Sequence, residues 1–216
     1  MHGFPASLLN GYKSFMDSRY TPERERFRQL ADQGQSPTTM IIACCDSRAA
    51  PETIFDAGPG ELFVLRNVAN LVPPFQPDGG QYGTSAAIEF AVNALGIRNI
   101  VVMGHGRCGG IRAALDPNGG PLAQGDFIGK WMNLLAPVSE AVSRYTLLTD
   151  KERQTMLERF SIRNSIANLR TFPYVKSLED EGKLQVHGAW FDISTGELWV
   201  LDKEGDFYRP KIELSA

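Results

Sequence analysis

Cysteine is scarce in this sequence of 216 residues, which contains three: Cys44, Cys45 and Cys108. So small and odd a number of thiols argues against a disulfide framework of the kind that holds small secreted domains together. Unpaired thiols are typical of a reducing compartment, where they bind a metal or take part in a reaction. We therefore expect a cytoplasmic protein.

Long apolar runs are also missing. No segment approaches the roughly 20 consecutive apolar residues that span a bilayer, and residues 1–10 lack the basic start and apolar core of a secretory signal. An excess of positive charge is absent as well, since the formal net charge is −3. Because binding to nucleic acid depends on a basic surface, we expect neither a membrane nor a nucleic acid as a partner.

The composition, 43% hydrophobic and 22% charged, is that of a globular chain that can bury a sizeable core. Strands alternating with helices indicate an α/β fold with a mostly parallel sheet flanked by helices, and a turn before the last strand adds an antiparallel strand near the C-terminus. The pattern predicts two helices within 6–33, strands at 38–44 and 61–65, a helix at 84–95, a strand at 99–103, helices at 126–145 and 150–172, and strands at 183–193 and 197–201.

Two motifs follow predicted strands directly. Residues 44–48 read CCDSR after the first strand, and residues 104–110 read GHGRCGG after the third. Ligands of open parallel sheets gather at the carboxyl ends of the strands. If the first and third strands are neighbours, the two motifs meet there.

The residue types in these motifs point to zinc. His105 and Cys108 are three residues apart, so both can reach one ion, and a cysteine of the first motif completes a set of two thiolates and an imidazole. Three protein ligands leave the fourth zinc position to water, which marks a catalytic site. Spacing does not choose between Cys44 and Cys45, although neighbours in an extended segment point to opposite faces and both cannot easily bind.

Asp46 and Arg48 are separated by one residue and can share a face. The arginine would keep the carboxylate ionised and oriented, and the carboxylate could accept a hydrogen bond from water on the zinc. The simpler interpretation is a salt bridge that ties down the turn.

The second motif also matches a dinucleotide-binding fingerprint, G-x-G-x-x-G after a strand, with Asp126 about 20 residues further on. That fingerprint normally follows the first strand of its unit, and a turn that binds pyrophosphate has no use for histidine and cysteine. A nucleotide-binding module is therefore a minor alternative. Another is a non-catalytic interaction domain that zinc stabilises.

At these residues the sequence resembles the β-carbonic anhydrases, most closely their plant-like branch, whose pattern is C-x-D-S-R followed by H-x-x-C. Further segments resemble family landmarks in family order and extend the likeness over roughly residues 30–200: 34–37 (GQSP), 59–61 (PGE), 66–70 (RNVAN), 86–89 (AAIE) and 187–190 (HGAW).

The resemblance implies one zinc per chain held by Cys44, His105 and Cys108, with Asp46 and Arg48 as catalytic residues. It implies hydration of CO2 to bicarbonate and a proton by zinc-bound hydroxide, or hydrolysis of carbonyl sulfide or carbon disulfide at the same site. It also implies a homodimer, alone or paired into tetramers or larger assemblies, with a dimerising helical arm at 1–34 and a catalytic domain at 35–216. The residues that the resemblance assigns to the substrate are Gln35, Phe63, Val68, Phe90, where plant enzymes have tyrosine, and Gly109.

Overall fold

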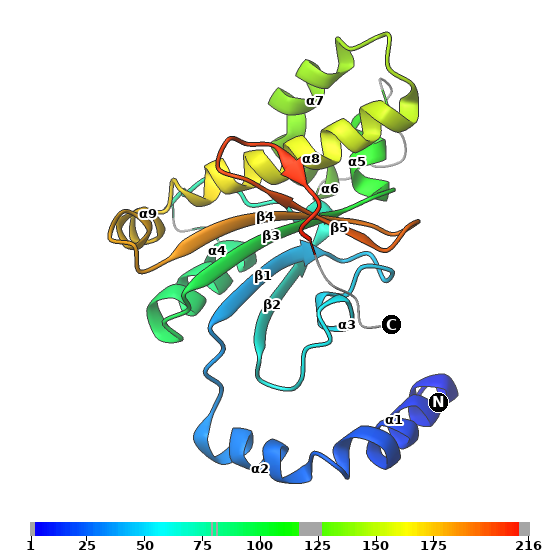
Figure 1. The fold of residues 1–216 in the computed structure, drawn as a ribbon, viewed down its shortest axis with the longest axis vertical. Helices are drawn as coiled ribbons and strands as arrows, with labels where there is room; N and C mark the ends of the chain where they lie inside the picture. Colours follow the sequence, from blue (N-terminus) through cyan, green and yellow to red (C-terminus); the bar gives the residue numbers. More distant parts are fainter. Residues whose placement is uncertain (1–2, 79, 81, 117–126, 212–216) are drawn as a thin grey trace.

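The structure, a computed structural model, describes residues 3–78, 80, 82–116 and 127–211. A six-stranded sheet lies at its centre, with the order β2-β1-β3-β4-β5-β6 (Figure 1). The first four strands in this order are parallel, and β5 and β6 add to the edge as antiparallel strands. This confirms the predicted fold class. The strands are β1 Thr39–Cys44, β2 Leu62–Asn67, β3 Asn99–His105, β4 Gln185–Asp192, β5 Glu197–Leu201 and β6 Phe207–Tyr208.

Proline explains two of the departures from the predicted helices. The helix predicted over 126–145 is divided, because Pro137 suits the first turn of a new helix, and Pro173 begins a further helix as well as following the end of the preceding one. Residue 126 lies outside the described residues. The helices are α1 Ala6–Phe15, α2 Arg24–Gln33, α3 Pro51–Ile54, α4 Gly83–Glu89, α5 Gly109–Ala114, α6 Ile128–Met132, α7 Ala136–Ser143, α8 Asp150–Leu169 and α9 Pro173–Asp180.

One face of the sheet is packed against helices. Met40 and Ile42 of β1 pack there with residues of α4 and α9, and Val102 of β3 packs with residues of α8. Helix α8 crosses the sheet closely because β3 and β4 present glycines to it: an added Cβ would lie 2.8 Å from Ile162 at Gly104 and 3.0 Å from Ile162 at Gly188. A capping box between Thr149 and Glu152 fixes where α8 begins.

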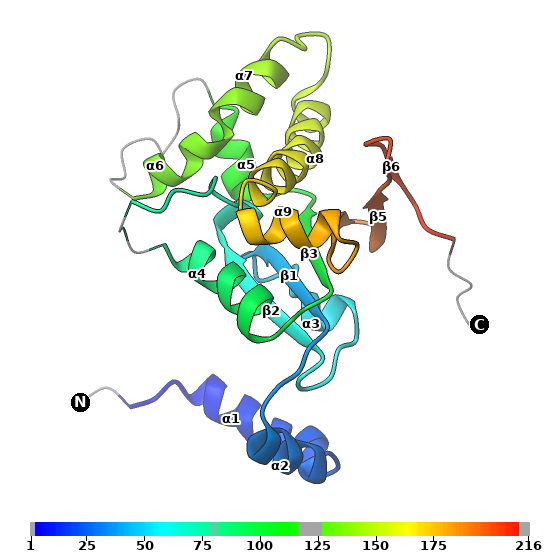
Figure 2. The same cartoon turned by 90° about the vertical axis from the view of Figure 1, so that its left-hand side faces the viewer.

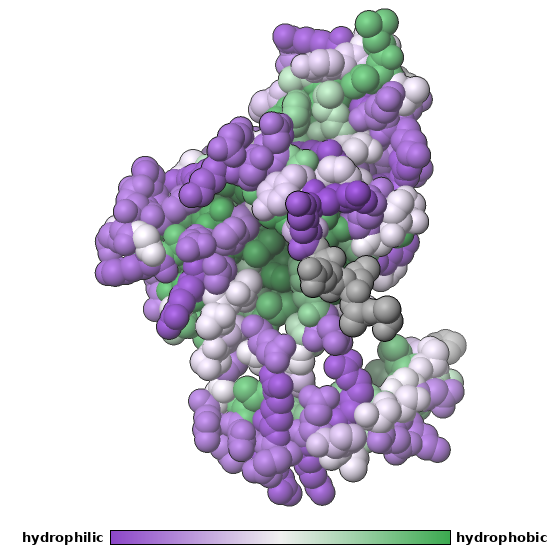
Figure 3. All heavy atoms as spheres, in the orientation of Figure 1, coloured by the Kyte–Doolittle hydropathy of each residue, from purple (hydrophilic) through white to green (hydrophobic). Residues whose placement is uncertain are grey.

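The other face is covered less completely. Ile41, Ala43, Met103 and Ala189 are buried there, with α3 beside them, whereas apolar residues around this cluster are only partly buried. Figure 3 shows hydrophobic residues gathered over the middle of this face, which Figure 1 presents to the viewer. Figure 2 shows α3 on this side and α4 on the opposite side of the sheet.

The segment before β1 forms a helical arm that extends away from the sheet (Figures 1 and 2). Arg26 anchors the arm, since its guanidinium donates to the Pro59 carbonyl at 3.1 Å and pairs with Glu61 at 2.9 Å. Neither α1 nor α2 contains a buried residue. Within the described residues, no helix combines the length and apolarity of a membrane span. The division at residue 34 stays a prediction. The large apolar residues that the arm exposes are Phe4, Leu8, Leu9 and Tyr12.

The close approach of α8 to the sheet predicts the effect of a single methyl group. At Gly188 an added Cβ would lie 3.0 Å from Ile162 and 3.0 Å from Leu201. We expect Gly188→Ala to lower the free energy of unfolding by about 1–3 kcal/mol through overpacking. Gly83→Ala is the matched control, because nothing lies within 4 Å of a Cβ there. Urea unfolding of the zinc-loaded proteins measures both, and equal stabilities would contradict this account.

Candidate metal centre

Three buried side chains converge at the carboxyl end of the sheet. Cys44 is the last residue of β1, His105 is the last of β3, and Cys108 directly precedes α5. Because β1 and β3 are parallel neighbours, their ends meet at one edge. One nitrogen or sulfur atom from each residue lies within 4.8 Å of the others, and the exposed fractions are 5%, 1% and 2%.

The His105 ring is oriented by its neighbour in the chain. Nδ1 lies 2.9 Å from the Gly106 carbonyl oxygen, which can only accept, so Nδ1 carries the proton. Nε2 then has a free lone pair, and it is buried without a hydrogen-bond partner. A buried polar atom without a partner is costly unless a ligand uses it. The tautomer and the burial therefore suit Nε2 to a metal ion.

The two buried sulfurs lie next to each other. The Ala69 amide donates to Cys44 Sγ at 3.4 Å, and the Cys108 sulfur lies 3.9 Å from it. Hydrogen bonding from Cys108 above all lowers the pKa of Cys44 to about 4, against the opposing effect of burial. The pKa of Cys108 is raised, because its proton is held by Cys44 and because it is buried. Cys44 thus takes the thiolate form that binds metals.

Strand alternation decides between the adjacent cysteines. Cys44 is buried in the cluster, whereas Cys45 is exposed. The assignment of Cys44 as the ligand, which the spacing alone left open, is confirmed. Cys45 takes no part in the cluster.

The donor set fits zinc. With Zn–S bonds of about 2.3 Å, two thiolates of a tetrahedral site lie about 3.8 Å apart, close to the observed 3.9 Å. Two sulfurs and an imidazole nitrogen are ligands that zinc prefers, and three protein ligands leave a position for water. Cys44, His105 and Cys108 therefore form a zinc site.

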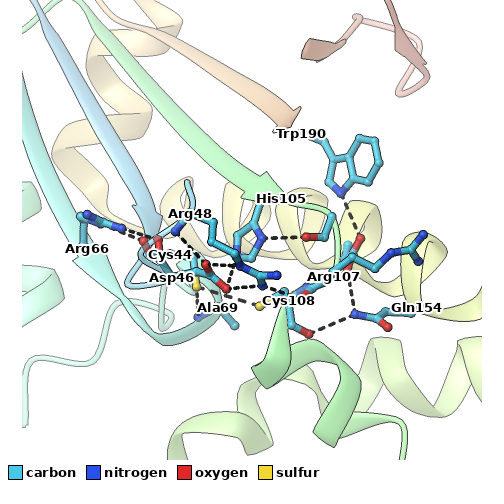
Figure 4. Close-up of polar contacts among 12 residues, drawn as sticks. Cys44, Asp46, Arg48, Arg66, Ala69, His105, Arg107, Cys108, Gln154 and Trp190 are labelled. Carbon is cyan, nitrogen blue, oxygen red and sulfur yellow. Dashed lines mark hydrogen bonds and ion pairs between the residues drawn. The ribbon is translucent and has the colours of Figure 1, made fainter. Parts of the chain in front are cut away.

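A carboxylate–guanidinium pair lies beside the ligands. Asp46 Oδ1 accepts from the Arg48 amide at 3.0 Å and from Nε at 2.9 Å, and Oδ2 accepts from Nη2 at 2.7 Å. The hydrogen bonds from Arg48 hold the pKa of Asp46 well below its usual range. Asp46 Oδ2 lies 3.8 Å from His105 Nε2. Figure 4 shows the pair next to the ligands.

Two residues that hold Cys44 and Asp46 in place were not identified as such from the sequence. Arg66 of β2 donates to the Cys44 carbonyl at 2.9 Å and to the Asp46 carbonyl at 2.6 Å, which fixes the backbone that carries both residues (Figure 4). Arg66 belongs to the RNVAN segment, which is the only signal that pointed to it. Ala69 in the same segment has φ +64°, a left-handed conformation that directs its amide at Cys44.

The remaining residues assigned to the substrate fall into two groups. Val68 and Gly109 lie next to Ala69 and Cys108, and therefore beside the metal site. Phe63 is paired with Met40, four residues before Cys44 and roughly 13 Å away along the strand. Phe63 contacts Phe90, with ring centroids 5.9 Å apart.

Gln35 is exposed and precedes β1, so it lies at the amino end of that strand, opposite the metal site. Within one chain the structure therefore does not bring Gln35, Phe63 and Phe90 to the zinc ligands. Their substrate roles stay predictions.

The dinucleotide interpretation of the same loop is not supported by its geometry. The side chains of His105 and Cys108 face Cys44 at the metal site, where a pyrophosphate turn would need an open backbone. Asp126 lies outside the described residues.

Comparisons with known proteins agree with this geometry. Residues 39–198 match the family model described as carbonic anhydrase. The chain is 34% identical to β-carbonic anhydrase 6, mitochondrial, of Arabidopsis thaliana, over 96% of this chain and 71% of the relative. It is also similar to the solved structure of the β-carbonic anhydrase CcaA, with a TM-score of 0.87, 30% identity, and coverage of 96% and 92% of the two chains.

A further similar structure comes from a study of two tetrameric β-carbonic anhydrases of Sordaria macrospora. Its TM-score is 0.78 and its identity 32%, with coverage of 90% of this chain and 95% of the other. The match of the family model, the identity to the plant relative and the Cys-His-Cys zinc site lead to one assignment: the chain belongs to the β-carbonic anhydrase family.

Proposed function

We propose that this protein catalyses the reversible hydration of CO2 to bicarbonate and a proton. The observation that carries the proposal is an ionised carboxylate, Asp46, held by Arg48 next to a buried set of three zinc ligands. A zinc site that only stabilised the fold would need neither an open position nor an oriented carboxylate beside it.

Asp46 directs the reacting water. Cys44, His105 and Cys108 would hold the zinc, which would supply a Lewis acid that lowers the pKa of a bound water. An ionised carboxylate can only accept hydrogen bonds, so Asp46 would accept one from a water bound at the metal and orient the oxygen of that water toward CO2. Arg48 keeps Asp46 ionised and fixes the direction of its oxygens.

Val68 and Gly109 would contact the substrate beside the metal. The Val68 side chain is 36% exposed next to the turn that contacts Cys44, and it suits the apolar CO2 molecule. The amide of Gly109, directly after Cys108, is the group that would donate to a substrate oxygen. Both assignments rest on the family resemblance and on the position of these residues beside the ligands.

A second copy of the chain completes the site in this proposal. The arm exposes apolar side chains, and one face of the sheet is only partly covered, so each could cover the other in a homodimer. Since Gln35, Phe63 and Phe90 lie away from the zinc ligands of their own chain, we place them at the site of the partner chain. The dimer can pair further into larger assemblies. A cytoplasmic location also stays our prediction.

Metal content is the first test. We expect the purified protein to contain about one zinc per chain and to lose CO2 hydration, measured by stopped flow, when a chelator removes the metal. Added zinc should restore the activity. Zinc without CO2 hydration would contradict the proposed reaction, and a parallel assay with carbonyl sulfide and carbon disulfide would show whether these are the substrates.

Asp46→Ala separates catalysis from metal binding. Asp46 is not among the three ligands, so we expect the variant to keep its zinc while kcat falls by about 100-fold or more, the scale of a lost general base or orienting group. Zinc analysis and stopped-flow rates on one preparation measure both. Lys176→Ala, which removes an exposed ion pair with Asp180, is the control. A wild-type rate in Asp46→Ala would remove this residue from the mechanism.

Complementation tests the shared site. We expect Gln35→Ala and Asp46→Ala to be defective separately, because each alters one part of every site. In a mixed dimer one site carries both substitutions and the other carries neither, so co-expression should restore up to about a quarter of wild-type activity. A mixture no more active than its components would place Gln35 outside the partner's site.

A further inference from the structure

The peptide group between Arg107 and Cys108 is held at both of its polar atoms. Its carbonyl oxygen accepts a hydrogen bond from Arg48 Nη2 at 3.2 Å. Its amide donates to Glu158 Oε1 at 3.0 Å. One peptide thus connects the Asp46–Arg48 pair to a carboxylate on α8. Figure 4 shows Arg107 and Cys108 between Arg48 and the side chains of Gln154 and Trp190.

Glu158 is almost completely buried, with 2% of its surface exposed. Oε1 accepts from Cys108 and from Gln154 Nε2 at 3.0 Å, and Oε2 accepts from Trp190 Nε1 at 3.1 Å. Among the described residues, no basic side chain lies within ion-pair distance of it. A buried carboxylate is costly to desolvate, so three donors directed at this one indicate that its acceptor atoms are needed there.

The loop that contains this peptide is conformationally unfavourable. Arg107 has φ +61°, a backbone conformation that residues other than glycine rarely adopt. Such a conformation persists where its surroundings determine it. Here the hydrogen bonds at both polar atoms of the Arg107–Cys108 peptide hold this conformation in place. Gln154 adds a third hydrogen bond by donating to the Cys108 carbonyl at 3.1 Å.

We propose that Glu158 is a positioning residue for the metal centre. It fixes the Arg107–Cys108 peptide, and through that peptide it sets both the ligand Cys108 and the carbonyl that holds Arg48 against Asp46. A hydrogen bond donated by the amide also polarises the peptide, which strengthens the carbonyl as an acceptor. The effect on turnover rests on the proposed function, whereas the effect on the Cys108 amide does not.

Two substitutions separate the acceptor from the charge. Glu158→Met removes both and keeps the length of the side chain. Glu158→Gln removes the charge but keeps one oxygen, which should face Cys108 because two donors lie on that side and one on the other. Trp190→Phe is the matched control, since it removes a donor to Glu158 and leaves the Cys108 hydrogen bond in place.

With zinc content equal to wild type, we expect kcat for CO2 hydration to fall about 10- to 100-fold in Glu158→Met, the usual effect of losing a group that orients a metal ligand. Glu158→Gln and Trp190→Phe should stay within a few-fold of wild type. Equal losses in the Gln and Met variants would show that the charge acts and not the acceptor, and would overturn the proposal. So would a wild-type kcat in Glu158→Met.

A second readout needs no activity, and its first part needs only the wild-type protein. Arg107–Cys108 is the only Arg-Cys pair in the sequence, so carbonyl-13C arginine with 15N cysteine selects the Cys108 amide in an NMR spectrum. In the zinc-loaded wild type this amide proton should resonate far downfield and exchange slowly, as expected for a donor to a buried carboxylate. In Glu158→Met it should move upfield. A wild-type proton at an ordinary shift, or one unmoved in the variant, would overturn the proposal even if CO2 hydration itself were absent.

Discussion

Parallel pairing of β1 with β3 is the constraint on which the metal centre depends. The register sets Ala43 beside Met103, so the ends of the two strands deliver Cys44 and His105 to the same place. Neighbouring strands lie about 4.8 Å apart, a separation that two side chains on one ion require. Every other contact at the site refines an arrangement that strand order and register already impose.

The refinement comes from both sides of the ligand cluster. Arg66 on β2 holds the backbone of Cys44 and Asp46, and α8 holds the loop that carries Cys108. Arg48 connects the two segments, because it donates to Asp46 in one and to the Arg107 carbonyl in the other. The site therefore depends on the seating of α8 against the sheet, and that seating depends on the small size of Gly104 and Gly188.

The sequence predicted the parts of this structure that depend on local pattern. Apolar runs located the strands, and the spacing of His105 and Cys108 indicated the metal, because these signals come from residues near one another in the chain. The choice of Cys44 over Cys45 needed the family resemblance, since spacing does not show which side of a strand faces the site. Glu158 could not be predicted, because nothing in a charged residue within a helix indicates that the helix buries it against a loop 50 residues earlier.

The positions of the ligands along the chain affect how the protein folds. Roughly 60 residues separate Cys44 from His105, and β2 and α4 lie between them. An ion bound by both is a cross-link that closes a long loop, and the entropy of the unfolded chain that such a link removes grows with loop length. The complete ligand set exists only where β3 lies beside β1, so a bound ion favours the folded chain over the unfolded one. The free energy of unfolding then depends on the zinc concentration, and not only the activity does so.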